Sequence, residues 1–298
     1  MTPLRPFVSL AFCFFGINFC NAAINIGCVG DSITAGVGVN NAAVDSYPAR
    51  LQKLLGTNYT VQNYGVSGTT LLTNGDMPYR NTTAYSNSHG RPIPPNIVTI
   101  MLGSNDSKPQ NWVYGTNFYS NYEVLIASYT NLTPSPRVLI CTPPPVFNNG
   151  YAGINPGIVA TNISPLIREL GTNLDIQVID MQSLLAGHSE WFPDNVHPNS
   201  QGTAVMAAIF YTALLGDTMN GSIPSLGINT LANNNAALNW PAGGAGWVLQ
   251  STSALGGTNT WIITTNSAVN NGTSALLTNS IAGQSAMFRL WNPSIQNN

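Results

Sequence analysis

Ser32 stands at a position where a nucleophile is useful. The apolar residues 24–29 predict a buried β-strand, and Gly30, Asp31 and Ser32 follow it directly. Ligands of open α/β sheets bind at the carboxyl ends of the strands, and a serine there becomes nucleophilic once a base removes its proton. We expect Asp31 to bond neighbouring backbone amides. Taken alone, the motif favours a polar turn that caps a helix over a nucleophile.

His197 is one of three histidines in the chain and has a nearby carboxylate. It lies three residues after Asp194, between the last predicted strand and the last predicted helix. At this spacing the carboxylate can accept a hydrogen bond from the imidazole and fix its tautomer. Ser32, His197 and Asp194 are therefore a candidate nucleophile, base and orienting acid for acyl transfer. Asp106 and Asp180 remain alternative partners, and a surface role for His197 also stays open.

Two further loops follow predicted strands at the same edge of the sheet, over residues 63–68 and 103–106. Acyl transfer requires hydrogen-bond donors aimed at the developing oxyanion. Gly65 can bring a backbone N–H close to a ligand because it lacks a side chain, and Asn105 offers a side-chain amide. Asn105 alone could also be a simple turn former.

Other residues compete for these roles less well. Ser67 lies in a GVSGT sequence that fails the GxSxG nucleophile pattern, because Thr69 replaces the second glycine. His89 lies in a polar loop, where solvation is favoured over substrate contact. His188 has no acidic residue at the spacing that Asp194 provides, which favours a structural or rim position.

Strand-like and helix-like segments alternate through the first 217 residues. The predicted strands span residues 24–29, 60–64, 97–102, 138–141 and 176–179, and the predicted helices span 47–55, 118–129, 158–170 and 202–215. Such alternation predicts a parallel sheet with helices on both faces. The first of these helices has Ser46 as a capping candidate, Pro48 in its first turn and Gly56 as its stop.

Four segments, taken in order, resemble the SGNH branch of the GDSL hydrolases. They are residues 30–34, 63–68, 103–106 and 194–198. The resemblance covers roughly residues 24–217 and implies a flavodoxin-like, three-layer α/β/α fold. It also implies a serine esterase that needs no cofactor.

The resemblance assigns a role to each candidate residue. It makes Ser32 the nucleophile and the first oxyanion donor, and Gly65 and Asn105 the other two donors. It makes His197 the base and Asp194 the acid that orients it. Four blocks in order are far more specific than one Gly-Asp-Ser tripeptide.

Composition excludes several classes of protein and divides the chain. Nine basic residues oppose eleven acidic ones among 298, so a strongly basic nucleic-acid binder and a polybasic membrane-surface protein are excluded. Every acidic residue lies between Asp31 and Asp217, whereas residues 218–298 carry one charge, Arg289. This change predicts a domain boundary near residue 217.

The chain is therefore expected to have four parts. Residues 1–22 are interpreted as a cleaved signal peptide, because Arg5 precedes a short apolar run and Ala22 follows it. The run is shorter than the roughly 20 residues that span a bilayer, so no stable membrane anchor and a secreted or periplasmic protein are expected. The hydrolase domain then occupies residues 23–217, a linker 218–226 and a β module 227–298.

The last part reads as a small antiparallel sandwich. Its predicted strands span residues 246–250, 260–264, 275–278 and 286–291. It resembles β modules appended to exported proteins of environmental bacteria, and the linker predicts few contacts with the hydrolase domain. Its tryptophans at positions 240, 247, 261 and 291 favour a packed core over a glycan-binding platform, although glycan contact stays open.

The two cysteines of the expected mature chain, Cys28 and Cys141, lie in separate predicted strands. If those strands are not neighbours, the Cα atoms are too far apart for a disulfide, so two buried free thiols are expected. The sequence contains no CxxC pair and no histidine cluster, and we predict no metal site.

The catalytic set does not by itself select a substrate, because this fold serves lipases, thioesterases and carbohydrate esterases alike. Export, polar loops and the lack of a long apolar insertion favour acetyl esters of carbohydrates. Residues 75–80 and 107–112 resemble segments of bacterial SGNH proteins labelled sialate or polysaccharide O-acetylesterases. Candidate sugar-stacking residues are Tyr79, Trp112, Tyr114 and Trp191, although such a group more often packs in the core or at the rim. The alternatives are a lipid-directed esterase, lysophospholipase or thioesterase, and an inactive scaffold with a glycan-binding tail.

Overall fold

A five-stranded parallel sheet forms the centre of the protein. The structure, a computed structural model, describes residues 23–90, 94–215, 226–231, 235–241, 248–252, 262–264, 269–270, 274–280 and 287–291. The sheet order is β2-β1-β3-β4-β5. Its strands are β1 (Ile24–Gly30), β2 (Tyr59–Gly65), β3 (Ile97–Met101), β4 (Arg137–Cys141) and β5 (Val178–Ile179). This order is that of flavodoxin-like folds, so the predicted fold class is confirmed.

The long predicted helices are present, together with short ones that the sequence pattern did not predict. The helices are α1 (Ser32–Ala35), α2 (Ala42–Asp45), α3 (Tyr47–Leu55), α4 (Thr83–Ser88), α5 (Pro109–Trp112), α6 (Phe118–Thr130), α7 (Pro156–Ile158), α8 (Ser164–Leu174), α9 (Met181–Leu184) and α10 (Ser200–Leu215). Short 3₁₀ turns are η1 (Tyr79–Asn81), η2 (Asn105–Ser107), η3 (Gly115–Asn117) and η5 (Ser189–Trp191), and a π-helical turn, η4 (Val159–Ile163), separates α7 from α8.

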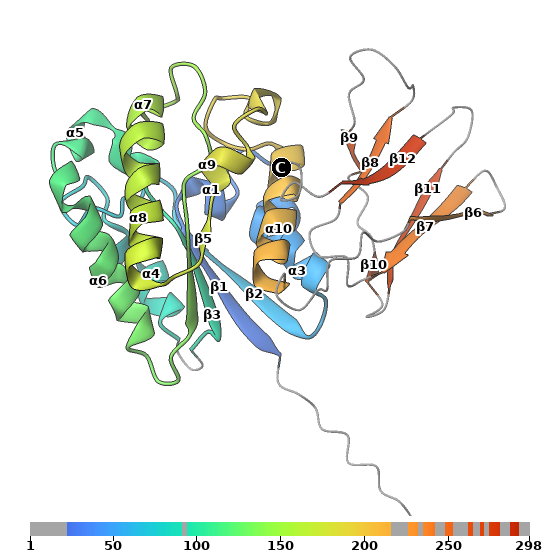
Figure 1. Ribbon diagram of the computed structural model, residues 1–298, viewed down its shortest axis with the longest axis horizontal. Helices are drawn as coiled ribbons and strands as arrows, with labels where there is room; N and C mark the ends of the chain where they lie inside the picture. The colour runs from blue at the N-terminus through green and yellow to red at the C-terminus, as the bar shows by residue number, and fades with distance from the viewer. Residues whose placement is uncertain are drawn as a thin grey trace, which may run out of the picture.

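Helices cover both faces of the sheet (Figure 1). On one face, Ile26 and Cys28 of β1 belong to the apolar cluster that contains α3 and α10. On the other face, Val29 belongs to the cluster that contains α6 and α8. Burial on both faces explains why the central strands are continuous apolar runs.

Local signals determine where α3 begins and ends. Ser46 Oγ accepts a hydrogen bond from the Ala49 N–H at 3.4 Å, and Gly56 follows the last turn with φ +72°. The ring of Tyr47 stacks on Phe210 of α10, with 4.6 Å between centroids and 9° between planes. This stack joins α3 to α10, the helix that follows His197.

Cys28 and Cys141 are buried free thiols, as predicted. Cys28 lies on β1 and Cys141 on β4, and β3 separates those strands. Burial raises the pKa of the Cys28 thiol to about 12, so this thiol stays protonated and unreactive.

After residue 225 every described strand pair is antiparallel. One sheet has the order β10-β11-β7-β6 and the other β12-β8-β9. The strands are β6 (Gly227–Leu231), β7 (Asn235–Pro241), β8 (Val248–Thr252), β9 (Ile262–Ile263), β10 (Val269–Asn270), β11 (Ser274–Ser280) and β12 (Met287–Trp291). The sequence pattern predicted β8, β9, β11 and β12 but missed the other three. These strands fit a small β module.

Trp240 supports the core interpretation of the module, because it is buried with Leu238, Leu249 and Leu277. The side chains of Trp247, Trp261 and Trp291 lie outside the described part of the chain.

The hydrolase domain and the β module share a small apolar contact, within the few contacts that the linker predicted. Val248 of β8 and Ile263 of β9 are buried in the same apolar cluster as Phe210 and Leu214 of α10. The 16-residue helix α10 is apolar around most of its circumference, so it buries one side against the parallel sheet and leaves another to be covered. Composition marked the boundary but gave no information about this contact.

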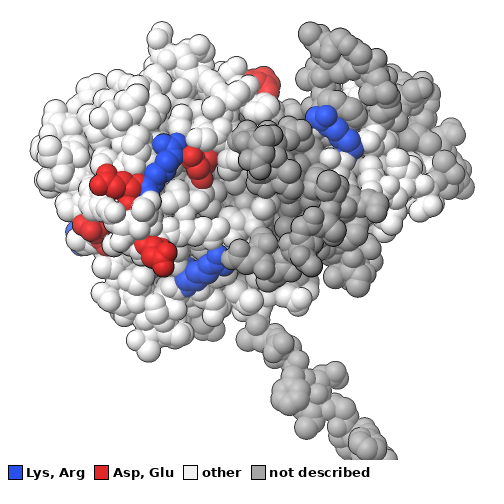
Figure 2. Space-filling model, in the orientation of Figure 1, with Lys and Arg blue, Asp and Glu red and all other residues white. Residues whose placement is uncertain are grey.

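Few side chains of the protein are charged. Figure 2 shows a few acidic and basic side chains on the viewed face, some of them side by side, among mostly uncharged residues. Within the described residues, no helix is long and apolar enough to cross a membrane. The predicted signal peptide, residues 1–22, and residues 216–225, which include most of the predicted linker, lie outside the described part.

Deleting residues 218–298 should leave turnover of small esters largely intact but lower the thermal unfolding midpoint by at least about 5 °C. Burial of an aliphatic side chain contributes about 1.5–3 kcal/mol, and the deletion uncovers α10. Calorimetry of the deletion variant, with p-nitrophenyl acetate hydrolysis alongside, checks both parts. An unchanged midpoint would mean that the module contributes nothing to the stability of the hydrolase domain.

Candidate active site

Ser32 is the first residue of α1 and lies two residues after the end of β1. Asp31 caps this helix, since its Oδ1 accepts the Ile33 N–H at 2.9 Å. A Cβ on Gly30 would lie 2.0 Å from Thr34 Oγ1, so the sharp turn from strand to helix requires glycine there. The predicted structural role of Asp31 is confirmed, and burial raises the pKa of its carboxyl to about 6.

Three side chains form a continuous hydrogen-bonded chain. Ser32 Oγ lies 2.9 Å from His197 Nε2, and His197 Nδ1 lies 2.6 Å from Asp194 Oδ2. With Nδ1–H donating to the carboxylate, Nε2 is left as the acceptor for the Ser32 hydroxyl proton. Ser32 and His197 are both buried, at 7% and 6% exposure, which limits competition from water. The structure thus brings together the three residues that the sequence selected.

The Asp194 carboxylate also organises its own loop. Its Oδ1 accepts the backbone N–H groups of Val196 at 3.0 Å and His197 at 2.7 Å. Burial alone would raise the pKa of Asp194, but the hydrogen bonds from His197 and Val196 lower it below its ordinary value. The carboxylate therefore stays ionised and holds the imidazole in one tautomer.

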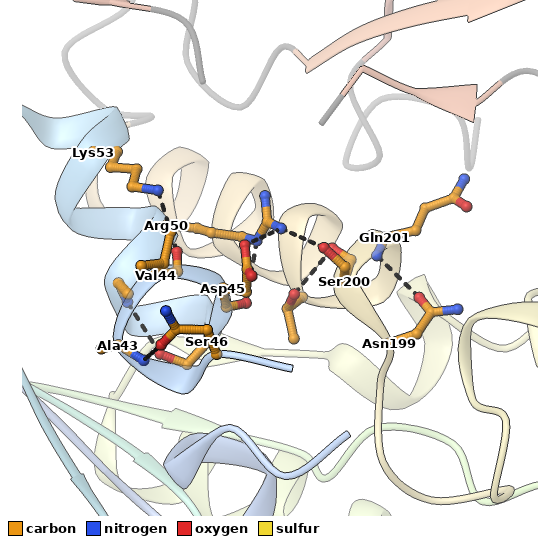
Figure 3. Close-up of polar contacts among 12 residues, drawn as sticks. Ala43, Val44, Asp45, Ser46, Arg50, Lys53, Asn199, Ser200 and Gln201 are labelled. Atoms are coloured by element: carbon orange, nitrogen blue, oxygen red, sulfur yellow. Dashed lines mark hydrogen bonds and ion pairs between the residues drawn. The ribbon is translucent and has the colours of Figure 1, made fainter. Parts of the chain in front are cut away.

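A second set of polar contacts fixes the start of α10, just after the base (Figure 3). Arg50 Nη2 lies 2.8 Å from Asp45 Oδ1 and donates to Ser200 Oγ at 2.5 Å. Asn199 Oδ1 caps α10 by accepting the Gln201 N–H at 3.0 Å. These contacts connect α3 with the helix that begins three residues after His197.

Gly38 brings the loop after α1 close to the base, and sequence analysis did not identify it. Its φ is +101°, and a Cβ there would lie 2.6 Å from the Pro198 carbonyl oxygen and 3.0 Å from His197 Cβ. Neither the backbone conformation nor the space admits a side chain. The one feature of the sequence that could have indicated this role is the position of Gly38 shortly after residues 30–34.

The expected role of Gly65 as an oxyanion donor needs correction. Its N–H already donates to Asn63 Oδ1 at 2.9 Å. A Cβ on Gly65 would lie 2.2 Å from the Ala35 nitrogen, so this glycine instead lets α1 pack closely on β2. The missing side chain of Gly65 does allow a close approach, as expected. The direction of the Gly65 N–H, however, is set by the side-chain amide of the neighbouring Asn63.

Asn105 is buried, and its side chain reaches the loop that follows β2. Its Nδ2 donates to the Thr69 carbonyl at 3.0 Å, which uses one of its two N–H bonds. In the same loop Gly68 has φ +84°, and its N–H has no hydrogen-bond partner within the described residues. The two predicted loops therefore do meet, through Thr69 rather than Gly65.

Asp106 fixes the continuation of that loop and is not a partner of His197. Its two carboxylate oxygens accept the N–H groups of Leu71 at 3.0 Å and Leu72 at 2.7 Å. It is fully buried, and burial raises the pKa of its carboxyl to about 7. Asp180, the other alternative partner, binds Arg168 through both oxygens at 2.9 Å.

The remaining histidines are engaged elsewhere. His89 lies 4.2 Å from the rings of both Tyr85 and Tyr129, and its Nε2 is 3.0 Å from Ser128 Oγ. His188 stacks on Trp191 at 3.7 Å and pairs with Glu190 at 2.9 Å. The contact of His188 agrees with the structural or rim position that the sequence favoured, whereas His89 is packed between two rings instead of being solvated as expected.

Ser67, the rival nucleophile, is exposed and makes no hydrogen bond to a histidine among the described residues. Within the part of the chain that the structure describes, no three His, Cys, Asp or Glu side chains are grouped so that they could hold a metal ion.

Two of the four predicted sugar-stacking residues cannot serve that purpose. Tyr79 and Trp191 are 1% and 3% exposed, so their rings belong to the core. Trp112 packs on Phe118 with 5.9 Å between centroids, and Tyr114 is exposed. The sequence missed Tyr151, an exposed ring 5.8 Å from the His197 ring.

Comparison with known proteins agrees with this geometry. The sequence profile of the GDSL-like lipase/acylhydrolase family matches residues 28–205, more than half of the chain. The chain belongs to the GDSL-like lipase/acylhydrolase family. The expected SGNH-type carboxylic ester hydrolase is thereby confirmed at the level of family and fold.

Individual members of the GDSL-like family support the same conclusion. The chain is 35% identical over 210 residues to an acetylxylan esterase of Xylanibacter ruminicola. This match covers 64% of the present chain and 43% of the esterase. The chain thus matches less than half of that relative's length. A solved carbohydrate acetylesterase family member from Sinorhizobium meliloti has TM-score 0.54 and 25% identity, covering 65% of this chain and 98% of its own. The aryl esterase of M. smegmatis shares the fold, with a TM-score of 0.53 and 21% identity. That match covers 66% of this chain and all of the aryl esterase chain.

Gly38→Ala should lower kcat for p-nitrophenyl acetate by roughly 10–100-fold, because the new Cβ displaces His197 from Ser32. Gly56→Ala is the matched control. Gly56 also has positive φ, at +72°, but its Cβ would meet nothing within 4 Å. The control should lose a little thermal stability and keep kcat within about twofold. Equal kcat in the two variants would contradict a close fit between Gly38 and the base.

Proposed function

We propose that this protein is a secreted serine esterase that removes acetyl groups from carbohydrates. The observation that carries the proposal is the unbroken hydrogen-bond chain from Ser32 through His197 to Asp194. A buried hydroxyl with a base at 2.9 Å, and an ionised acid behind that base, is suited to nucleophilic attack on an ester carbonyl.

The reaction then follows in two halves. Ser32 Oγ attacks the ester carbonyl carbon while His197 Nε2 takes the hydroxyl proton. When the tetrahedral intermediate collapses, the carbon–oxygen bond to the alcohol breaks, and His197 returns the proton to the departing alcohol oxygen. In the second half His197 removes a proton from water, which attacks the carbonyl carbon of the acyl-Ser32 ester. The bond from that carbon to Ser32 Oγ then breaks, and His197 returns the proton to Oγ, which releases the carboxylic acid and restores Ser32. Asp194 stabilises the transient imidazolium and keeps its own negative charge.

Three donors are proposed for the oxyanion. The Ser32 N–H is available because the first amides of a helix have no partner within the helix. Asn105 Nδ2 has one N–H left after its bond to Thr69. The third donor is the Gly68 N–H, which replaces the Gly65 N–H because that group is bound to Asn63. Gly68 and Asn105 belong to one connected structure through Thr69.

The acetyl and carbohydrate specificity rests on the relatives. The curated relative at 35% identity is an acetylxylan esterase, and the Sinorhizobium neighbour is a carbohydrate acetylesterase family member. Both matches cover about two thirds of this chain. The family profile matches residues 28–205, which contain Ser32 and His197. The sequence also lacks a long apolar insertion that could line an acyl tunnel.

Secretion is proposed from the first 22 residues. Arg5, the following apolar run and Ala22 have the order of a signal peptide. An acetylated polysaccharide is too large to enter a cell, so export would bring enzyme and substrate together.

A series of p-nitrophenyl esters from acetyl to octanoyl tests the acyl specificity. Since each methylene that a pocket cannot accept costs about 1–3 kcal/mol, kcat/KM should fall at least tenfold between butyryl and octanoyl. Ser32→Ala, which removes the nucleophile but should still fold, supplies the background rate. The wild-type enzyme is then assayed for release of acetate from acetylated xylan, pectin and sialic acid. Preference for octanoyl esters or lysophospholipid would support the lipid-directed alternative instead.

A further inference from the structure

Tyr151 lies beside the base but takes no part in the hydrogen-bond chain of Ser32, His197 and Asp194. Its ring centroid is 5.8 Å from that of His197, with 71° between the planes, so an edge faces a ring. The side chain is 53% exposed, an unusual fraction for a tyrosine in contact with a buried histidine. Much of its ring is therefore free to contact another molecule.

The loop that presents Tyr151 has a defined shape. Left-handed backbone at Gly150, Ala152 and Gly153, with φ of +69°, +50° and +82°, turns the chain around the tyrosine. The Tyr151 carbonyl accepts the Ile154 N–H at 3.0 Å, and Ile154 itself is buried. A Cβ on Gly150 would lie 2.0 Å from the Ile154 oxygen, so this turn requires glycine.

The same loop is bonded to the segment that carries the base. The Phe147 N–H donates to the Asn195 carbonyl at 3.0 Å, and Asn148 Nδ2 donates to Asn195 Oδ1 at 2.8 Å. Asn195 lies between Asp194 and His197 in sequence. The position of the Tyr151 ring is therefore coupled to the position of the imidazole, independently of the contact between the two rings.

This position relates Tyr151 to one half of the substrate. His197 returns its proton to the alcohol oxygen, so the departing alcohol must pass within hydrogen-bond distance of Nε2. The carbonyl oxygen of the ester points instead toward the proposed oxyanion donors. A ring fixed against His197 and open to solvent is therefore placed on the side of the departing alcohol.

We propose that Tyr151 is a specificity-determining residue that binds the alcohol side of the ester by packing against a saturated ring such as a sugar. The inference deepens the proposed function and rests on it. A tyrosine offers a flat apolar face for the C–H side of a pyranose and a hydroxyl at its rim. The loop fixes this face before substrate arrives, which reduces the ordering cost of binding.

Two acetyl esters that differ only in the alcohol provide the test. In cyclohexyl acetate the alcohol is a saturated ring, and in ethyl acetate it is too small to reach across the Tyr151 face. The measured quantity is the ratio of kcat/KM for the two esters. Tyr151→Ala should lower this ratio about tenfold, whereas Tyr151→Phe, which keeps the ring, should hold it within about twofold. The shift should be absent from Tyr114→Ala, the variant of the exposed tyrosine that the sequence had favoured.

Three results would overturn the proposal. The ratio could stay unchanged in Tyr151→Ala, or it could move in Tyr114→Ala instead. Both esters could also lose rate equally in Tyr151→Ala, which would make the ring a support for His197. Failure of the proposed function gives a different pattern, because wild-type enzyme would then release no acetate from acetylated sugars while the ester ratio still depends on Tyr151.

Discussion

The hydrogen bond between Ser32 Oγ and His197 Nε2 joins residues that are 165 positions apart in the sequence. A bond of 2.9 Å at that separation constrains everything around it, since a shift of about 1 Å would remove the base from the hydroxyl. The parallel sheet supplies the coarse alignment, because β1 and the chain after β5 both emerge at one edge. Gly30 then admits the turn into α1, and Gly38 admits the loop that packs on His197.

The aspartates near the site show how environment divides one residue type into different roles. Asp31 and Asp106 are fully buried, and burial raises the pKa of their carboxyls to about 6 and about 7. Both hold backbone N–H groups and so shape the loops that carry Ser32 and Asn105. Asp194 is more exposed, and hydrogen bonds from His197 lower its pKa, which keeps it ionised beside the imidazole. Asp194 is thus the most readily ionised of the three carboxyls, and it is the one bonded to the His197 ring.

Much of this arrangement could be predicted from the sequence, because its signals are local. Continuous apolar runs identified the strands, and the three-residue spacing identified Asp194 as the acid that holds His197. What escaped prediction depends on three-dimensional placement. The Gly65 N–H is turned away by the neighbouring Asn63 amide, and the solvent exposure of Tyr151 depends on a loop bonded to Asn195. The contact of Val248 and Ile263 with α10 likewise leaves no trace in composition.

A crystal structure of the enzyme after reaction with a serine-directed phosphonate tests the central claim most directly, because the adduct resembles the tetrahedral intermediate. Phosphorus should be bonded to Ser32 Oγ. The phosphoryl oxygen should lie within about 3.1 Å of the Ser32 nitrogen, the Gly68 nitrogen and Asn105 Nδ2. Phosphorus on Ser67, or a phosphoryl oxygen bound by the Gly65 nitrogen, would contradict the account.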